Sequence, residues 1–200
     1  MKRLILMLTV AIASTAAMAQ NNFKANVATA KTSYASNKLE EAHFALQQML
    51  TEIDVTIGKE VLKLLPAKMD TMTAVKKEDN VSGNIGFVGA TIHRVYGGES
   101  KRGTIDIVNN SPLIGTLNAF LTNPLLANMG GDGNTKVIKV QGYKGRLTKE
   151  ENGDGGKTGY RLELPFNNAM ITFNVTNTSD AEITAMANTL PLAQIAKLIQ

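Results

Sequence analysis

Ser111 and His93 are the side chains whose types could start an acyl-transfer reaction, because a serine hydroxyl becomes a nucleophile when a histidine takes its proton. The surrounding sequence does not support that chemistry. No serine in the chain sits in a Gly-x-Ser-x-Gly segment, the turn that presents the nucleophile in many hydrolases. Ser111 is followed by Pro112, a pair typical of the first turn of a helix. A small hydrolase built on Ser111 and His93 is therefore the least favoured of three functional interpretations.

Metal chemistry is not indicated by the sequence either. The chain has two histidines, His43 and His93, and no cysteine. A metal site needs several ligands at defined spacing, and neither histidine belongs to a His-x-x-x-His or His-Glu-x-x-His segment. We therefore expect no metal and no cofactor, and we interpret both histidines as hydrogen-bonded or partly exposed.

Arg94 and Tyr96 are the strongest binding candidates. Two residues apart on a strand, they point to the same face of the sheet. An arginine among apolar neighbours needs a partner or an opening to water, and two interpretations stay open. Arg94 is either part of a structural ion pair with its stem buried, or a polar anchor in a groove beside the helix start at Ser111, where free backbone N–H groups favour an anion. The candidate binding residues are Arg94, Tyr96 and Ser111.

These candidates lie on a stretch that predicts two strands followed by helices. Polar and apolar residues alternate over residues 86–96 and again over 104–109, which is typical of half-buried strands. The polar, glycine-led segment 97–102 suits a hairpin loop. A helix begins at Ser111-Pro112, and Asn123-Pro124 repeats the same start signal.

The first nineteen residues have the features of a cleaved signal peptide. Lys2 and Arg3 precede an apolar run over residues 4–13, which is too short to span a bilayer. Ala-Met-Ala at residues 17–19 supplies the small residues of a cleavage site, so the mature chain is expected to begin at Gln20. The sequence therefore predicts export to the periplasm or the extracellular space.

Residues 20–66 predict a helical segment that ends at Pro66. Apolar residues recur every three or four positions, which is typical of an amphipathic helix. Residues 34–42 resemble the turn and second helix of a tetratricopeptide repeat, with Asn37 where that repeat prefers glycine. A single copy cannot bury a repeat face, so we expect a helical hairpin.

Apolar residues of this segment and of the segment after Pro124 exceed what one narrow stripe needs. Core packing is the preferred interpretation, and an interface or an apolar ligand cavity is the alternative for the surplus. The surplus residues are Met49, Leu50, Leu64, Leu65, Leu125 and Leu126.

The rest of the chain predicts short strands and a closing helix. The expected elements are a short strand at 69–75, a loop at 76–80, a long strand at 137–147 containing Gly142 and Gly145, a hairpin at 160–175 turning at Asn167-Asn168, and a helix opened by the capping box Ser179-x-x-Glu182. We therefore expect an α+β fold, with a mostly antiparallel sheet of about five or six strands, packed helices and an N-terminal helical hairpin. Residues 67–200 would form the core and pack with the helices as one domain.

The charge balance argues against a nucleic-acid partner. The chain has 21 Lys and Arg against 17 Asp and Glu, a net charge of +4. Removing Lys2 and Arg3 with the signal peptide leaves 19 against 17, a net of +2. So slight a basic excess does not provide the charged surface that nucleic-acid binding needs.

Several positions match a recognisable pattern. They are Arg94-x-Tyr96, Asn110-Ser111-Pro112-Leu113, Asn123-Pro124 and the strand around Gly142. Over residues 69–200 the chain thereby resembles a family of small exported bacterial proteins of unassigned function, which usually has aspartate where this chain has Asn110. The arrangement is also similar to the PsbP/Mog1 type of α/β/α sandwich. By analogy, this resemblance implies a binding or assembly role.

The sequence thus predicts an exported, non-enzymatic binding or assembly protein of the bacterial cell envelope, with its partner unspecified. A carrier of a small apolar ligand is the alternative, and the hydrolase is the third. Asp70-Thr71-Met72 resembles a short O-glycosylation acceptor pattern of some exported bacterial proteins, but we interpret Thr71 as an ordinary surface threonine.

Overall fold

The computed structural model describes residues 22–84, 89–123, 133–151 and 158–199. The predicted signal peptide, most of the helix expected after Asn123, and the residues Leu125 and Leu126 lie outside these ranges. The chain divides into two compact units, Met1–Asp54 and Val55–Gln200. The division falls within helix α2 (Leu39–Leu64). The two units are described separately.

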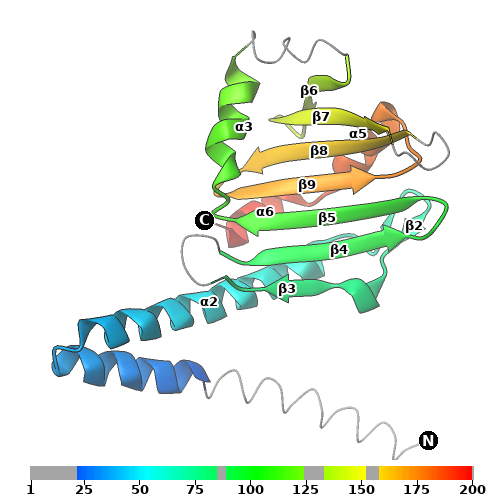
Figure 1. Cartoon of the computed structure of the whole chain (residues 1–200). Coiled ribbons are helices and arrows are strands. Elements are labelled where there is room, and N and C mark those ends of the chain that lie inside the picture. Colours follow the sequence, from blue (N-terminus) through cyan, green and yellow to red (C-terminus); the bar gives the residue numbers. More distant parts are fainter. Residues whose placement is uncertain (1–21, 85–88, 124–132, 152–157, 200) are drawn as a thin grey trace, which may run out of the picture. The chain divides into compact units, whose positions relative to one another are not determined.

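The N-terminal unit contains the expected helical hairpin (Figure 1). Helix α1 covers residues 22–35, and α2 begins at Leu39. Asn37 has a φ of 56° in the turn between them, and the Lys38 amide donates to the Ser33 carbonyl over 2.8 Å. The left-handed conformation predicted for Asn37 is therefore confirmed, and it reverses the chain so that the two helices run antiparallel.

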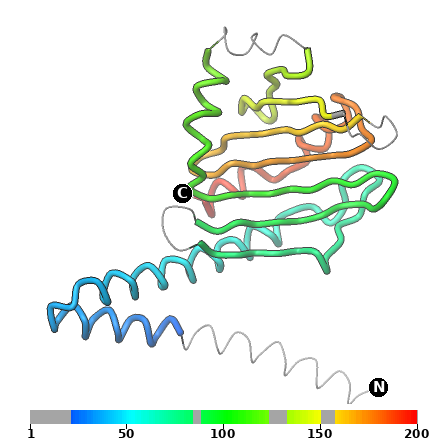
Figure 2. Tube along the Cα trace, in the orientation of Figure 1, coloured from blue at the N-terminus to red at the C-terminus, as the bar shows by residue number. Residues whose placement is uncertain are grey.

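The larger unit is built on a seven-stranded antiparallel sheet (Figure 2). In spatial order its strands are β3 (Asn80–Ser82), β4 (Thr91–Gly97), β5 (Arg102–Asn109), β9 (Ala169–Val175), β8 (Thr158–Phe166), β7 (Tyr143–Glu151) and β6 (Thr135–Val140). The α+β class and the antiparallel pairing are confirmed, and the sheet has more strands than the five or six expected.

One extra strand comes from the segment predicted as a single long strand at residues 137–147. Gln141 and Gly142 have φ values of 49° and 91°. Positive φ at both central residues is the signature of a tight hairpin turn, so β6 and β7 are two strands and the long strand was wrong. Gly145 marks close packing instead, because a Cβ there would lie 3.0 Å from the Glu163 carbonyl oxygen.

The segment before β4 also has more structure than expected. A two-stranded hairpin, β1 (Lys68–Met69) with β2 (Met72–Thr73), takes the place of one short strand. The predicted loop at 76–80 holds a turn of 3₁₀ helix, η1 (Lys76–Glu78), that leads directly into β3.

Helices cover both faces of the sheet in this unit. They are α3 (Leu113–Thr122), α5 (Asp180–Ala187) and α6 (Leu192–Leu198). Successive residues of a strand point to opposite faces, and on β9 Met170 packs with Leu117 and Leu121 of α3, whereas Phe173 packs in the main core with α5, α6 and the end of α2. In Figure 1, α3 and α6 accordingly lie on opposite sides of the strands.

The local helix signals are largely confirmed. The Ser179 side chain accepts from the Glu182 amide and Glu182 reciprocates, which is the predicted capping box. Helix α3 begins at Leu113, so Pro112 occupies the capping position rather than the first helical one. Within the described ranges, none of the helices has both the length and the apolar character needed to cross a bilayer.

Candidate functional site

Arg94 is buried on the core side of β4, where its guanidinium is held by oxygens of the same unit. Its Nε and Nη2 donate to the Asp79 carboxylate over 2.9 and 2.6 Å. Its Nη1 donates to the Leu65 carbonyl over 2.9 Å. The hydrogen bonds that Arg94 donates to Asp79 raise the pKa of Arg94, although burial opposes that change. The two side chains are only 8% and 15% exposed, so the geometry favours the structural ion pair over the polar anchor.

Tyr96 has a similar role next to Arg94. Its ring is fully buried, and its hydroxyl donates to the Pro66 carbonyl over 2.9 Å. Burial raises the pKa of Tyr96 to about 12. Arg94 and Tyr96 thus share one face of β4, as predicted, and together they fix the chain where it leaves α2.

Ser111 lies apart from these two residues. Its side chain is buried, and its Oγ accepts from the Leu113 amide at 3.4 Å, at the start of α3. No hydrogen bond among the described residues joins it to Arg94, Tyr96 or His93. The groove proposed from the sequence, with Arg94 and Ser111 on its two sides, is therefore not assembled by the contacts we observe.

His93 lies on the opposite face of β4 and pairs with Asp106 of β5. Its Nδ1 is 2.6 Å from Asp106 Oδ1, and both side chains are about one-third exposed, at 33% and 35%. A hydrolase needs a nucleophile within reach of such a histidine, and no serine among the described residues bonds to it. His43 is exposed on α2. In the described ranges, no cluster of three or more His, Asp or Glu is arranged to hold a metal.

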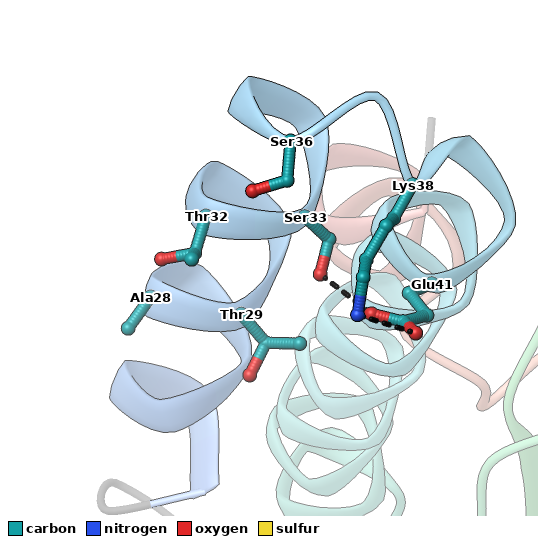
Figure 3. A pocket seen from close by; sticks show the side chains of 7 residues that line it. All are labelled: Ala28, Thr29, Thr32, Ser33, Ser36, Lys38 and Glu41. Atoms are coloured by element: carbon teal, nitrogen blue, oxygen red, sulfur yellow. Dashed lines mark hydrogen bonds and ion pairs between the residues drawn. The ribbon is translucent and has the colours of Figure 1, made fainter.

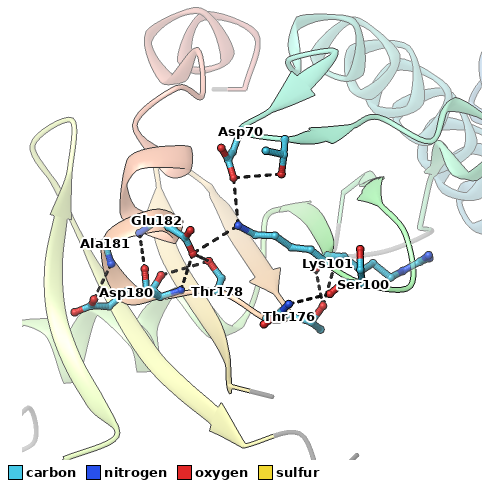
Figure 4. Close-up of polar contacts among 12 residues, drawn as sticks. Asp70, Ser100, Lys101, Thr176, Thr178, Asp180, Ala181 and Glu182 are labelled. Carbon is cyan, nitrogen blue, oxygen red and sulfur yellow. Dashed lines mark hydrogen bonds and ion pairs between the residues drawn. The ribbon is translucent and has the colours of Figure 1, made fainter. Parts of the chain in front are cut away.

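A polar cluster that sequence reasoning missed joins three distant segments (Figure 4). Lys101, in the β4–β5 loop, places its Nζ 3.2 Å from Asp70 and 3.5 Å from Glu182. Asp70 belongs to the turn between β1 and β2, and Glu182 to the first turn of α5. Thr178 also donates to Glu182 over 2.9 Å. No local signal could have found this cluster, because its charged members, Asp70, Lys101 and Glu182, are 31 or more positions apart in the sequence.

Two hollows in the described regions are lined mainly by polar residues. One, of about 370 Å³, lies between α1 and α2 (Figure 3) and is lined by Ala28, Thr29, Thr32, Ser33, Ser36, Lys38 and Glu41. A second, of about 180 Å³, is lined mainly by polar residues of β6, β7 and their neighbours. A carrier of an apolar ligand needs a largely apolar pocket, so neither hollow favours that alternative.

Besides Phe44, the hairpin also exposes six large apolar side chains. Their exposed fractions run from 42% to 73%. On α1 and α2 they are Val27, Tyr34, Leu39, Leu46, Leu50 and Ile53. Of the surplus residues predicted to pack in the core, Leu65 is buried and Leu64 packs against the core, whereas Leu50 is exposed. Phe44 is equally exposed, at 56%, but it points elsewhere, as the helix geometry shows.

Most of the exposed apolar residues come directly after, in the sequence, a residue that lies between the two helices. Ser33 bonds to Glu41 and Asn26 to Glu52 across the hairpin, and Ala45 is buried. Val27, Tyr34, Leu46 and Ile53 each come one position after Asn26, Ser33, Ala45 and Glu52, respectively. One position is a rotation of about 100°, so these four exposed residues are turned from the contact line in the same sense.

The two helices are antiparallel. A rotation that has the same sense when each helix is followed along the chain therefore places the exposed apolar residues of α1 and those of α2 on the same side of the hairpin. Leu39, Leu46, Leu50 and Ile53 fall within an arc of about 60° on α2. Thr32 and Phe44 instead precede contact residues, which places them on the other side, with the polar hollow. We call Val27, Tyr34, Leu39, Leu46, Leu50 and Ile53 the apolar side of the hairpin.

Comparison with known proteins does not extend this description: no protein-family model, no curated protein and no solved structure matches the chain. The resemblance to small exported bacterial proteins and to the PsbP/Mog1 sandwich stays a prediction.

Proposed function

We propose that this chain is an exported, non-enzymatic binding or assembly protein of the bacterial cell envelope, and that the helical hairpin is its binding element. The observation that carries the proposal is the apolar side of the hairpin. Proteins that act alone rarely expose a contiguous apolar patch of this kind, and such patches commonly mark interaction sites. The amphipathic face of a helix is also a common way to recognise another helix or a groove.

The two alternatives have less support among the described residues. For the carrier, neither of the two hollows described above offers a largely apolar lining. The hydrolase has a histidine paired with a carboxylate, but the serine assigned to it accepts a hydrogen bond from the Leu113 amide instead.

The export part of the proposal rests on the N-terminal sequence. We expect the protein isolated from cells to begin near Gln20, because Ala-Met-Ala at residues 17–19 suits signal peptidase. N-terminal sequencing of the cellular product measures this directly. A product that keeps Met1 and stays in the cytosol would rule out export.

The binding part is tested by capture from an envelope extract. We expect the tagged mature protein to retain specific envelope components, and Leu50→Glu to lose at least about 90% of that retention, because a charge at the centre of an apolar contact is left desolvated and unpaired. The readout is the amount of each retained component at equal concentrations of folded protein.

Phe44→Glu is the matched control for this experiment. It places the same charge on the same helix, at a similarly exposed position, but away from the apolar side. We expect its retention to equal that of the wild type. If both variants retained as much as the wild type, the hairpin would not be the binding element.

A further inference from the structure

The two helices of the hairpin carry charges of opposite sign. Residues 22–35 of α1 contain Lys24 and Lys31 and no acidic residue. Residues 39–54 of α2 contain four acidic residues and no lysine or arginine. Glu41 and Glu52 bond to α1 across the hairpin, whereas Asp54, one position after Ile53, borders the apolar side. A surface bordered by lysines on one helix and by an aspartate on the other is complementary to itself at these positions after a twofold rotation.

The register of the two helices identifies which residues would meet in such a pair of copies. Asn26 bonds to Glu52 across the hairpin, so Lys24 and Asp54 lie at one level along the helix axes. A twofold axis parallel to the helices would place α1 of one copy against α2 of the other. This rotation leaves the position of each residue along the helix axis unchanged. Lys24 would then meet Asp54 of the second copy, and Val27 would meet Leu50.

We infer that the partner covering the apolar side is a second copy of this chain, with the two hairpins forming a four-helix bundle in which α1 packs on α2 of the other copy. This inference rests on the proposed function, because it names the partner of the same surface. The spacing agrees with it: Val27 and Tyr34, and likewise Leu39, Leu46 and Ile53, are seven residues apart, the repeat of helices that pack side by side in bundles.

The environment of Asp54 supports the same arrangement. Partial burial raises the pKa of its carboxyl group, because desolvation disfavours the charged form. A lysine of a second copy at the same level would offset that cost. The tetratricopeptide-like segment agrees too, since a single helical pair of this kind needs a neighbour to bury its face.

The area of the apolar side indicates how tightly two copies should bind. Two helices about 10 Å wide and about 20 Å long present roughly 400 Å² per copy, or about 800 Å² in total, which is at or below the low end of specific interfaces. We therefore expect a reversible dimer with a Kd on the order of micromolar rather than a permanent one.

Sedimentation of the purified mature protein over a range of concentrations tests the inference. The wild type should pass from monomer to dimer, and Leu46→Glu should raise the Kd by about 30-fold or more, as for a central contact. Phe44→Glu should leave the Kd unchanged. Lys24→Glu and Asp54→Lys should each weaken the dimer, and the two changes together should restore it. Circular dichroism checks that each variant is folded.

Disulfide trapping gives a second measurement, which the absence of native cysteine makes clean. An equal mixture of Val27→Cys and Leu50→Cys copies should form a crosslink between the two variants under mild oxidation. The mixture of Val27→Cys with Phe44→Cys should not.

Three results would overturn the inference. The first is a wild type that stays monomeric up to roughly 500 µM, far above a micromolar Kd. The second is a dimer whose Kd is unchanged by Leu46→Glu. The third is a crosslink yield with the Phe44→Cys control equal to that with Leu50→Cys. A monomer whose capture of envelope components still depends on Leu50 would remove the second copy as partner and leave the proposed function intact.

Discussion

Phe173→Ala is expected to lower the free energy of unfolding by about 3–5 kcal/mol, the range found when a fully buried aromatic ring is truncated in a core that cannot close around the gap. Phe173 is completely buried in the middle of β9. Its backbone neighbours across the sheet are Ile105 on β5 and Leu162 on β8. Because these neighbours sit on strands paired on both sides, they have little freedom to move into the space.

Denaturant titration of the wild type and the variant measures this loss. Thr172→Ala is the control from the same strand, since Thr172 points to the other sheet face and is only partly buried. We expect it to cost less than about 1 kcal/mol. A loss below about 1 kcal/mol for Phe173→Ala, well under the usual range, would mean that the two faces of β9 are assigned wrongly.

Features set by neighbouring residues could be predicted from the sequence. The turn at Asn37, the capping box at Ser179 and the hairpin at Asn167 each depend on residues within a few positions of one another. The alternation of apolar residues on β9 also identified its buried face. Local signals of this kind were enough to give the α+β class.

Two strands were not predicted correctly, because the local sequence gives only a weak signal for them. Gln141-Gly142 is not one of the dipeptides that mark a tight hairpin turn most strongly, so its flanking strands were merged into one. Strand β3 has only three residues, too few for alternation to be seen.

The candidate site could be predicted only in part, because partners distant in sequence decide it. The pattern placed Arg94 and Tyr96 on one face but could not name Asp79, Leu65 and Pro66 as what they bind. Periodicity likewise identified the apolar stripe of α2 without showing whether another element covers it. Exposure of Leu46 and Leu50 depends on the placement of α1, which no local pattern determines.

The second large effect is expected at the buried ion pair. Arg94→Met and Asp79→Asn should each lower the free energy of unfolding by about 3–5 kcal/mol, because removal of one partner leaves the other charge buried without compensation. Arg94→Met keeps much of the packing of the side-chain stem, so the loss reports on the charge and its hydrogen bonds. The double variant should cost less than the sum of the two single changes, since neither charge then remains.

Arg102→Met is the matched control, because Arg102 pairs with Glu78, the residue just before Asp79, but at the surface, where the side chains are 44% and 35% exposed. That pair should contribute about 0–1 kcal/mol. Envelope components retained at equal folded concentration should not differ between the wild type and Arg94→Met, because the guanidinium already donates to Asp79 and Leu65. The opposite pattern, a loss of stability below about 1 kcal/mol together with a loss of retention, would make Arg94 a contact for the partner and move the binding site from the hairpin to the sheet.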